Sequence, residues 1–165
     1  MRARLLASVI GVLAPLALAA QTPTPAPVYT RADTLRGSYT SAGRAWWDVA
    51  FYDLHVRIDP ADSTIRGWNA IDYRVLSPGK ELQIDLMTPL QVDSMIQDRK
   101  RLKFRRDSNA FFVTPVTPQR AGQRKTITVY YHGRPRIAAR PPWSGGFTWA
   151  TDSLGRSWIV TTDQG

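Results

Sequence analysis

The stretch that decides the fold is residues 51–58, Phe-Tyr-Asp-Leu-His-Val-Arg-Ile. Its apolar and polar side chains alternate, which is the period-two pattern of a half-buried β-strand. One face carries Tyr52, Leu54, Val56 and Ile58, and the other carries Asp53, His55 and Arg57. Residues 59–62, Asp-Pro-Ala-Asp, favour a turn because proline presets φ and aspartate bonds its own backbone. Residues 65–76 then form the returning strand of a predicted hairpin, with Ile71, Tyr73 and Val75 facing inward and Asn69, Asp72 and Arg74 on the polar face.

Further short segments follow at regular spacing. They are residues 82–86, 90–97, 100–105, 111–116, 125–131, 147–151 and 157–161, separated by turns at 77–80, 107–109 and 152–155. The chain also holds 12 Pro and 11 Gly, more than a helical bundle tolerates. We therefore expect an all-β fold, an antiparallel β-sandwich.

The start of the chain has a different composition. Residues 1–20 combine two arginines, an apolar run and a small-residue cleavage site, which predicts a secretory signal peptide. Residues 21–45 are rich in Pro and Thr and are expected to be a linker, so the folded domain is predicted at residues 46–165. We expect an exported protein, periplasmic or extracellular. With no cysteine in the sequence there is no lipid-attachment site, and no stable membrane anchor is expected.

The net charge of +9 raises the question of a nucleic-acid partner. The export signal argues against one. The densest basic run, residues 99–106, has Leu102 and Phe104 at alternate positions. It is therefore interpreted as an edge strand whose charged face protects against edge-to-edge pairing.

The sequence offers few groups for catalysis. Its only histidines are His55 and His132, and its only glutamate is Glu81, so it cannot form a His-Glu-x-x-His zinc site. No Gly-x-Ser-x-Gly motif is present, and the aspartates lack the spacing of a calcium loop. Both histidines are expected at the surface. No catalytic or metal-binding residue is predicted in this chain.

Aromatic residues gather towards the end of the sequence. They are Trp143, Phe147, Trp149 and Trp158. From composition, a platform that stacks on sugars and ordinary core or interdomain packing are equally good interpretations.

The order of the motifs resembles a known family. Residues 47–59, followed by Ser-Thr-Ile-Arg-Gly at 63–67, resemble the opening hairpin of the zinc aminopeptidases that include aminopeptidase N and leukotriene hydrolase. Residues 90–94, 127–133 and 141–147 are similar to the same family's N-terminal domain, in the same order. The resemblance covers residues 46–165.

This resemblance implies a saddle-like β-sandwich packed on a thermolysin-like catalytic domain of the same polypeptide. It implies that residues 162–165, Thr-Asp-Gln-Gly, help form the pocket for the α-amine of a peptide substrate, with Gln164 and Gly165 as the substrate-binding residues. Asp163 stands where relatives often have Cys. A carboxamide oxygen can accept a hydrogen bond from an ammonium group, which suits Gln164.

The family's Gly-x-Met-Glu-Asn segment and zinc-binding helix do not occur in this sequence. The resemblance thus implies a fragment of a zinc metallo-aminopeptidase that is inactive alone, with zinc in the missing catalytic domain. It also favours packing for Phe147, Trp149 and Trp158. The alternative is a stand-alone secreted β-sandwich module that binds carbohydrate or protein.

Overall fold

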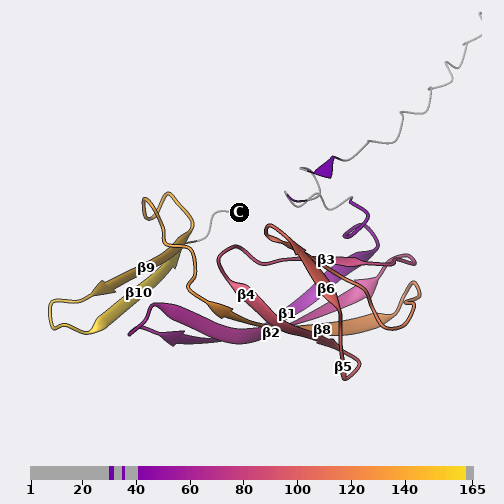
Figure 1. Ribbon diagram of the computed structural model, residues 1–165, viewed down its shortest axis with the longest axis horizontal. Coiled ribbons are helices and arrows are strands. Elements are labelled where there is room, and N and C mark those ends of the chain that lie inside the picture. The colour runs from indigo at the N-terminus through magenta and orange to yellow at the C-terminus, as the bar shows by residue number, and fades with distance from the viewer. Residues whose placement is uncertain (1–29, 32–34, 36–40, 163–165) are drawn as a thin grey trace, which may run out of the picture.

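The structure, a computed structural model, describes Thr30, Arg31, Leu35 and residues 41–162, and its described part is built from antiparallel β-sheets (Figure 1). The largest sheet has the order β1-β2-β8-β4-β5, with bounds Trp47–Asp59, Thr64–Val75, Arg124–Gly133, Gln91–Gln97 and Lys100–Arg101. A three-stranded sheet has the order β3-β7-β6, with bounds Leu82–Asp85, Ala110–Val113 and Phe104–Asp107. The last two strands, β9 (Gly146–Thr151) and β10 (Ser157–Thr162), form a separate hairpin. The predicted all-β antiparallel sandwich is confirmed.

The core lies between the five-stranded and the three-stranded sheets. The inward residues of β2 alternate as the sequence predicts, with Ile71, Tyr73 and Val75 buried, and Ile127 and Val129 of β8 are buried beside them. They pack against Leu82, Ile84, Phe111 and Val113 of the smaller sheet and against Met95 of β4. In Figure 1 the three-stranded sheet covers one end of the large sheet, and the β9–β10 hairpin extends beyond the other end.

The predicted opening hairpin is confirmed, but the burial predicted for β1 is wrong. Strand β1 pairs with β2 in antiparallel register, with a bulge between Val49 and Phe51. Its apolar face is open: Tyr52 is 56% exposed, Leu54 59%, and Val56 and Ile58 42% each. The reason is length. The strands of the covering sheet have 4 residues each and β1 has 13, and at about 3.3 Å per residue the short strands cannot cover the whole of β1.

Asn69 also differs from the prediction. It was expected on the polar face of β2, but it shares its parity with the buried residues Ile71 and Tyr73 and therefore points to the same face. Together with Tyr52 and Leu54 it borders a cavity. A polar side chain thus lies on the apolar side of the sheet.

The basic segment at 100–105 is not one strand. It divides into β5 and β6, which belong to different sheets, and Leu102 between them is buried in the core. Both strands lie at the edge of their sheets, as the charge pattern predicts. The strand is interrupted because the Leu102 side chain is buried in the core at the point where the chain passes from one sheet to the other.

Residues 41–45, assigned to the linker from sequence, form a turn against β3. The backbone N–H of Gln83 donates to the carbonyl of Gly43 at 2.9 Å, and Arg44 forms an ion pair with Asp85. The predicted signal peptide, residues 1–20, lies outside the described residues, as do residues 21–29, 32–34 and 36–40 of the predicted linker. In the described part of the chain, no helix has the length and hydropathy needed to cross a membrane.

Candidate functional site

The predicted substrate-binding residues, Gln164 and Gly165, lie outside the described residues. The described chain ends at Thr162, the last residue of β10. The hydroxyl of Thr162 donates to the carbonyl oxygen of Ser144 at 2.8 Å, and Thr162 is paired with Gly146 on β9. The end of β10 is therefore held at the base of the hairpin.

Gly146 fixes that base. Its φ is +137°, and a Cβ added there would lie 2.7 Å from the carbonyl oxygen of Arg136 and 2.8 Å from the nitrogen of Ala138. Phe147 donates its N–H to the same Arg136 oxygen at 2.8 Å. Only glycine gives the close backbone approach that joins the hairpin to residues 136–138.

The aromatic residues of the hairpin fall into two groups. Phe147 and Trp149 stack with ring centroids 5.4 Å apart and pack on a second core cluster of Ile65, Leu90 and Tyr131. The packing interpretation is confirmed for these two rings. Trp158, by contrast, is 57% exposed.

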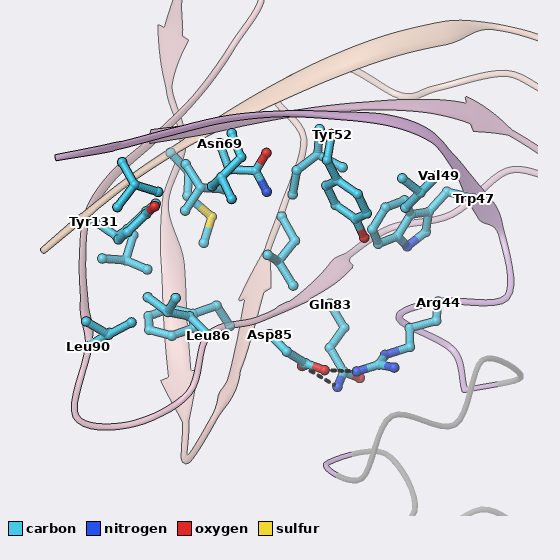
Figure 2. A pocket seen from close by; sticks show the side chains of 18 of the residues that line it. Arg44, Trp47, Val49, Tyr52, Asn69, Gln83, Asp85, Leu86, Leu90 and Tyr131 are labelled. Atoms are coloured by element: carbon cyan, nitrogen blue, oxygen red, sulfur yellow. Dashed lines mark hydrogen bonds and ion pairs between the residues drawn. The ribbon is translucent and has the colours of Figure 1, made fainter. Parts of the chain in front are cut away.

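An apolar groove of about 800 Å³ lies beside the uncovered part of the large sheet (Figure 2). One wall is the open face of β1, with Tyr52, Leu54 and Val56, and the lining also includes Leu90 and Phe147. An apolar hollow of this kind suits an apolar group of a ligand.

Polar groups enter the groove at two places. Asn69 points into it from β2, and within the described structure its Oδ1 is buried without a hydrogen-bond partner. At the other end Asp85 accepts a hydrogen bond from Gln83 Nε2 at 3.2 Å and pairs with Arg44, as Figure 2 shows. The Asn69 oxygen is a free acceptor for a donor on whatever fills the groove.

Two tyrosines in and below the groove have a pKa that burial raises. Burial raises the pKa of Tyr131, which lines the groove, so its phenol stays neutral at ordinary pH. Deeper in the core, burial raises the pKa of Tyr73, although hydrogen bonds with Gln97 and Gln119 oppose the rise. Neither tyrosine is prepared to act as a base at neutral pH.

The two histidines lie at the surface, as predicted. His55 Nε2 lies 3.0 Å from Asp53 Oδ1, and its ring stacks on Trp68 with centroids 3.8 Å apart. His132 Nδ1 lies 2.7 Å from Asp93 Oδ1. Among the described residues there is no group of three or more His, Cys, Asp or Glu side chains that would hold a metal ion. A zinc site therefore does not fit the residues that the structure describes.

The fold matches solved enzymes. A two-domain M1 zinc metallopeptidase mutant bound to L-arginine aligns with a TM-score of 0.56 and 20% identity, over 73% of this chain and 31% of that chain. An M1 zinc metallopeptidase from Deinococcus radiodurans aligns with a TM-score of 0.56 and 19% identity, over 71% and 30% of the two chains. Leukotriene A4 hydrolase from Saccharomyces cerevisiae aligns with a TM-score of 0.52 and 16% identity, over 71% and 19%.

The fold is that of a domain of M1 zinc metallopeptidases. The resemblance found in the sequence is thereby confirmed at the level of the fold. No protein-family model matches this sequence, and no curated protein matches it either. The chain spans less than a third of the length of the M1 metallopeptidase bound to L-arginine.

Sequence reasoning missed the groove in this M1-type fold. Two signals for it are present in the sequence. Asn69 has the parity of Ile71, which places one polar group among apolar ones. The apolar segments at 82–86 and 111–116 are also much shorter than the opening hairpin, so they leave part of it uncovered.

Proposed function

We propose that this chain is the N-terminal, non-catalytic domain of an exported zinc metallo-aminopeptidase that removes N-terminal residues from peptides. The observation that carries the proposal is the fold match to M1 zinc metallopeptidases over 73% of this chain but only 31% of the matched chain. In this proposal the zinc, the general base and the group that stabilises the oxyanion belong to a downstream catalytic domain of the same polypeptide.

The proposed role of the domain is to support the pocket for the substrate's α-amine. Gln164 follows Thr162 by two residues, so its Cα lies within about 7 Å of the Thr162 Cα. Thr162 is hydrogen-bonded to Ser144, so the residue from which this segment continues is held at the base of the hairpin. From there the Gln164 carboxamide oxygen accepts a hydrogen bond from the substrate ammonium group, and Gly165 leaves room for the substrate backbone.

The first experiment compares two polypeptides. The 165-residue chain is assayed with aminoacyl chromogenic substrates, beside the polypeptide extended through the coding sequence that follows Gly165. We expect zinc-dependent turnover from the extended polypeptide and none from the chain alone. Turnover by the chain alone, or an extension without an in-frame His-Glu-x-x-His, would contradict the proposal.

The second experiment tests Gln164 in the extended enzyme. A hydrogen bond to a charged group contributes about 1.5–3 kcal/mol, so Gln164→Ala is expected to reduce kcat/KM on free-amine substrates by about 10-fold to 100-fold. The control is Gln91→Ala, at an exposed position on β4, which should leave the kinetic constants unchanged. If Gln164→Ala behaves like this control, Gln164 is not in the pocket.

Export is tested separately. Residues 1–20 are proposed to be a cleaved signal peptide, and the mature protein is proposed to be periplasmic or extracellular. N-terminal sequencing of the secreted product should find a start close to Gln21. A product that keeps Met1 and stays in the cytoplasm would contradict export.

The alternative function is a stand-alone module that binds carbohydrate or protein. It rests on two tryptophans that are exposed to solvent, Trp143 at 76% and Trp158 at 57%. Aromatic rings at the surface can stack on sugars. Quenching of tryptophan fluorescence by oligosaccharides, lost in Trp158→Ala, would favour this function; no change in fluorescence would exclude the sugar-binding form.

A further inference from the structure

The outer edge of β1 is a long, exposed sheet edge in the described structure. Strand β1 stands at the end of the sheet order and pairs with β2 alone. Along its 13 residues there is no Pro and no Lys; its bulge lies near one end, and the charges of its regular part are of both signs, Asp53 and Asp59 with Arg57. Its regular part, residues 51–59 after the bulge, is exposed on both faces. A long edge strand with open backbone groups is a template for another strand.

We propose that two copies of this chain pair through β1, antiparallel, about a two-fold axis at His55. In this register Asp53 of one copy lies opposite Arg57 of the other, and the symmetry repeats the pair. On the apolar face Leu54 lies opposite Val56, and Tyr52 opposite Ile58. Opposite charges and matched apolar residues across a strand pair both stabilise it. The occupant of the open edge is therefore a second copy of the same strand.

Neighbouring registers are less favourable, including the one with its axis at Leu54, which places Asp53 opposite His55 but leaves Arg57 opposite Phe51, without an acidic partner. Apolar residues must stay opposite apolar residues, so the two-fold axis can lie at a residue but not between two residues. An axis at Val56 would place Asp53 opposite Asp59 and His55 opposite Arg57. An axis at Asp53 or at Arg57 would place the charged residue opposite its own copy. Like charges directly opposite each other destabilise a strand pair.

The charged residues of β1 and their neighbours on β2 also favour pairing with a second copy. On β2 the residue opposite Arg57 is Arg66, another cation. Opposite Asp53 is Ala70, which offers no charge, and the group beside Asp53 in its own copy is His55, with Nε2 at 3.0 Å from its Oδ1. In the proposed pair, Asp53 of the second copy lies opposite Arg57 and supplies the acidic partner that β2 does not. The same pairing brings Leu54 and Val56 of both copies together beside their grooves, which reduces the exposed apolar area.

The first test measures mass in solution. The 18.5 kDa chain should approach twice its mass with rising concentration in sedimentation equilibrium. Asp53→Arg places arginine opposite Arg57 at two symmetric positions, and the dissociation constant should rise by about tenfold or more. Arg57→Asp should do the same. The exchange of both residues, Asp53→Arg with Arg57→Asp, restores opposite charges and should recover dimerisation. A chain that is monomeric at all concentrations, or an exchange variant no better than the single variants, overturns the proposal.

The second test places a thiol at the axis. The sequence has no cysteine, so His55→Cys introduces a single one, at an exposed position. Opposed Cα atoms in an antiparallel pair lie about 4.5–5.5 Å apart, within the range of a disulfide. Mild oxidation should therefore produce a covalent dimer. The control Phe51→Cys, at a position 61% exposed, keeps Asp53 and Arg57, puts the two thiols eight residues from register, about 26 Å apart, and should stay uncrosslinked. Equal crosslinking of both variants, or none at residue 55, overturns the register.

Discussion

The buried hydroxyl of Tyr73 is the most direct test of how the core is held together. It accepts a hydrogen bond from Gln97 Nε2 and donates one to Gln119 Oε1, each at 2.9 Å. The three side chains are almost completely buried, and Gln119 Nε2 closes the network by donating to Gln97 Oε1 at 2.8 Å. The network joins β2, β4 and the loop before β8.

The substitution Tyr73→Phe removes the hydroxyl and keeps the ring. Gln97 Nε2 retains the carbonyl of Thr126 at 3.3 Å, but Gln119 Oε1 loses its donor. One buried acceptor without a partner costs about 1–3 kcal/mol. We expect the free energy of unfolding to fall by about 2 kcal/mol.

Urea unfolding followed by tryptophan fluorescence measures this change. With an m-value of about 2 kcal/mol/M, the midpoint should fall by about 1 M. The matched control is Tyr130→Phe on β8, because that side chain is 37% exposed and its loss should change stability by less than about 0.5 kcal/mol. If the two variants unfold at the same urea concentration, the network does not stabilise the fold and our reasoning is wrong.

Three further predictions concern stability. Burial raises the pKa of Tyr73 in the folded state above the ordinary 10.0. The contribution of its neutral phenol to the free energy of unfolding is therefore complete below pH 10 and falls as the pH rises, by up to about 1.4 kcal/mol per pH unit. Urea unfolding from pH 9 to 11 should show a smaller fall for Tyr73→Phe than for the unaltered chain. Gly146→Ala should destabilise the β9–β10 hairpin by about 2 kcal/mol or more, since the added Cβ meets the Arg136 oxygen at 2.7 Å, and faster limited proteolysis after the substitution would show it. The control Gly122→Ala, at φ +84° with nothing within 4 Å, should cost only about 1 kcal/mol. Phe111→Ala should cost about 3–5 kcal/mol because its ring fills the core, and a melting temperature equal to that of the unaltered chain would refute this.

The candidate site was only partly within reach of sequence reasoning. The resemblance to zinc aminopeptidases pointed to Gln164 and Gly165, which follow the last described residue, and their role stays a prediction. The groove beside β1 was not anticipated, because the sequence was interpreted as if every alternating apolar face were covered. The predicted face of Asn69 is wrong for a related reason, because a polar residue within an apolar row does not by itself indicate the polar side of a strand.

The sequence by itself determined where most of the strands lie. Alternation, turn residues and the shift of composition at the start of the chain are local properties, and local φ and ψ preferences follow from them. The hairpin of β1 and β2, the inward residues Ile71, Tyr73 and Val75 of β2, and the two last strands on either side of a turn were all predicted on this basis.

Only the tertiary structure decided which strand faces the opposite sheet buries. Whether residues 100–105 serve one sheet or two depends on where the opposite layer lies, and Leu102 in the core separates them. Whether the apolar face of β1 is buried depends on strands about 30 to 60 residues away along the chain, which are too short to reach it. Burial is a property of pairs of layers, so no pattern within one strand can determine it.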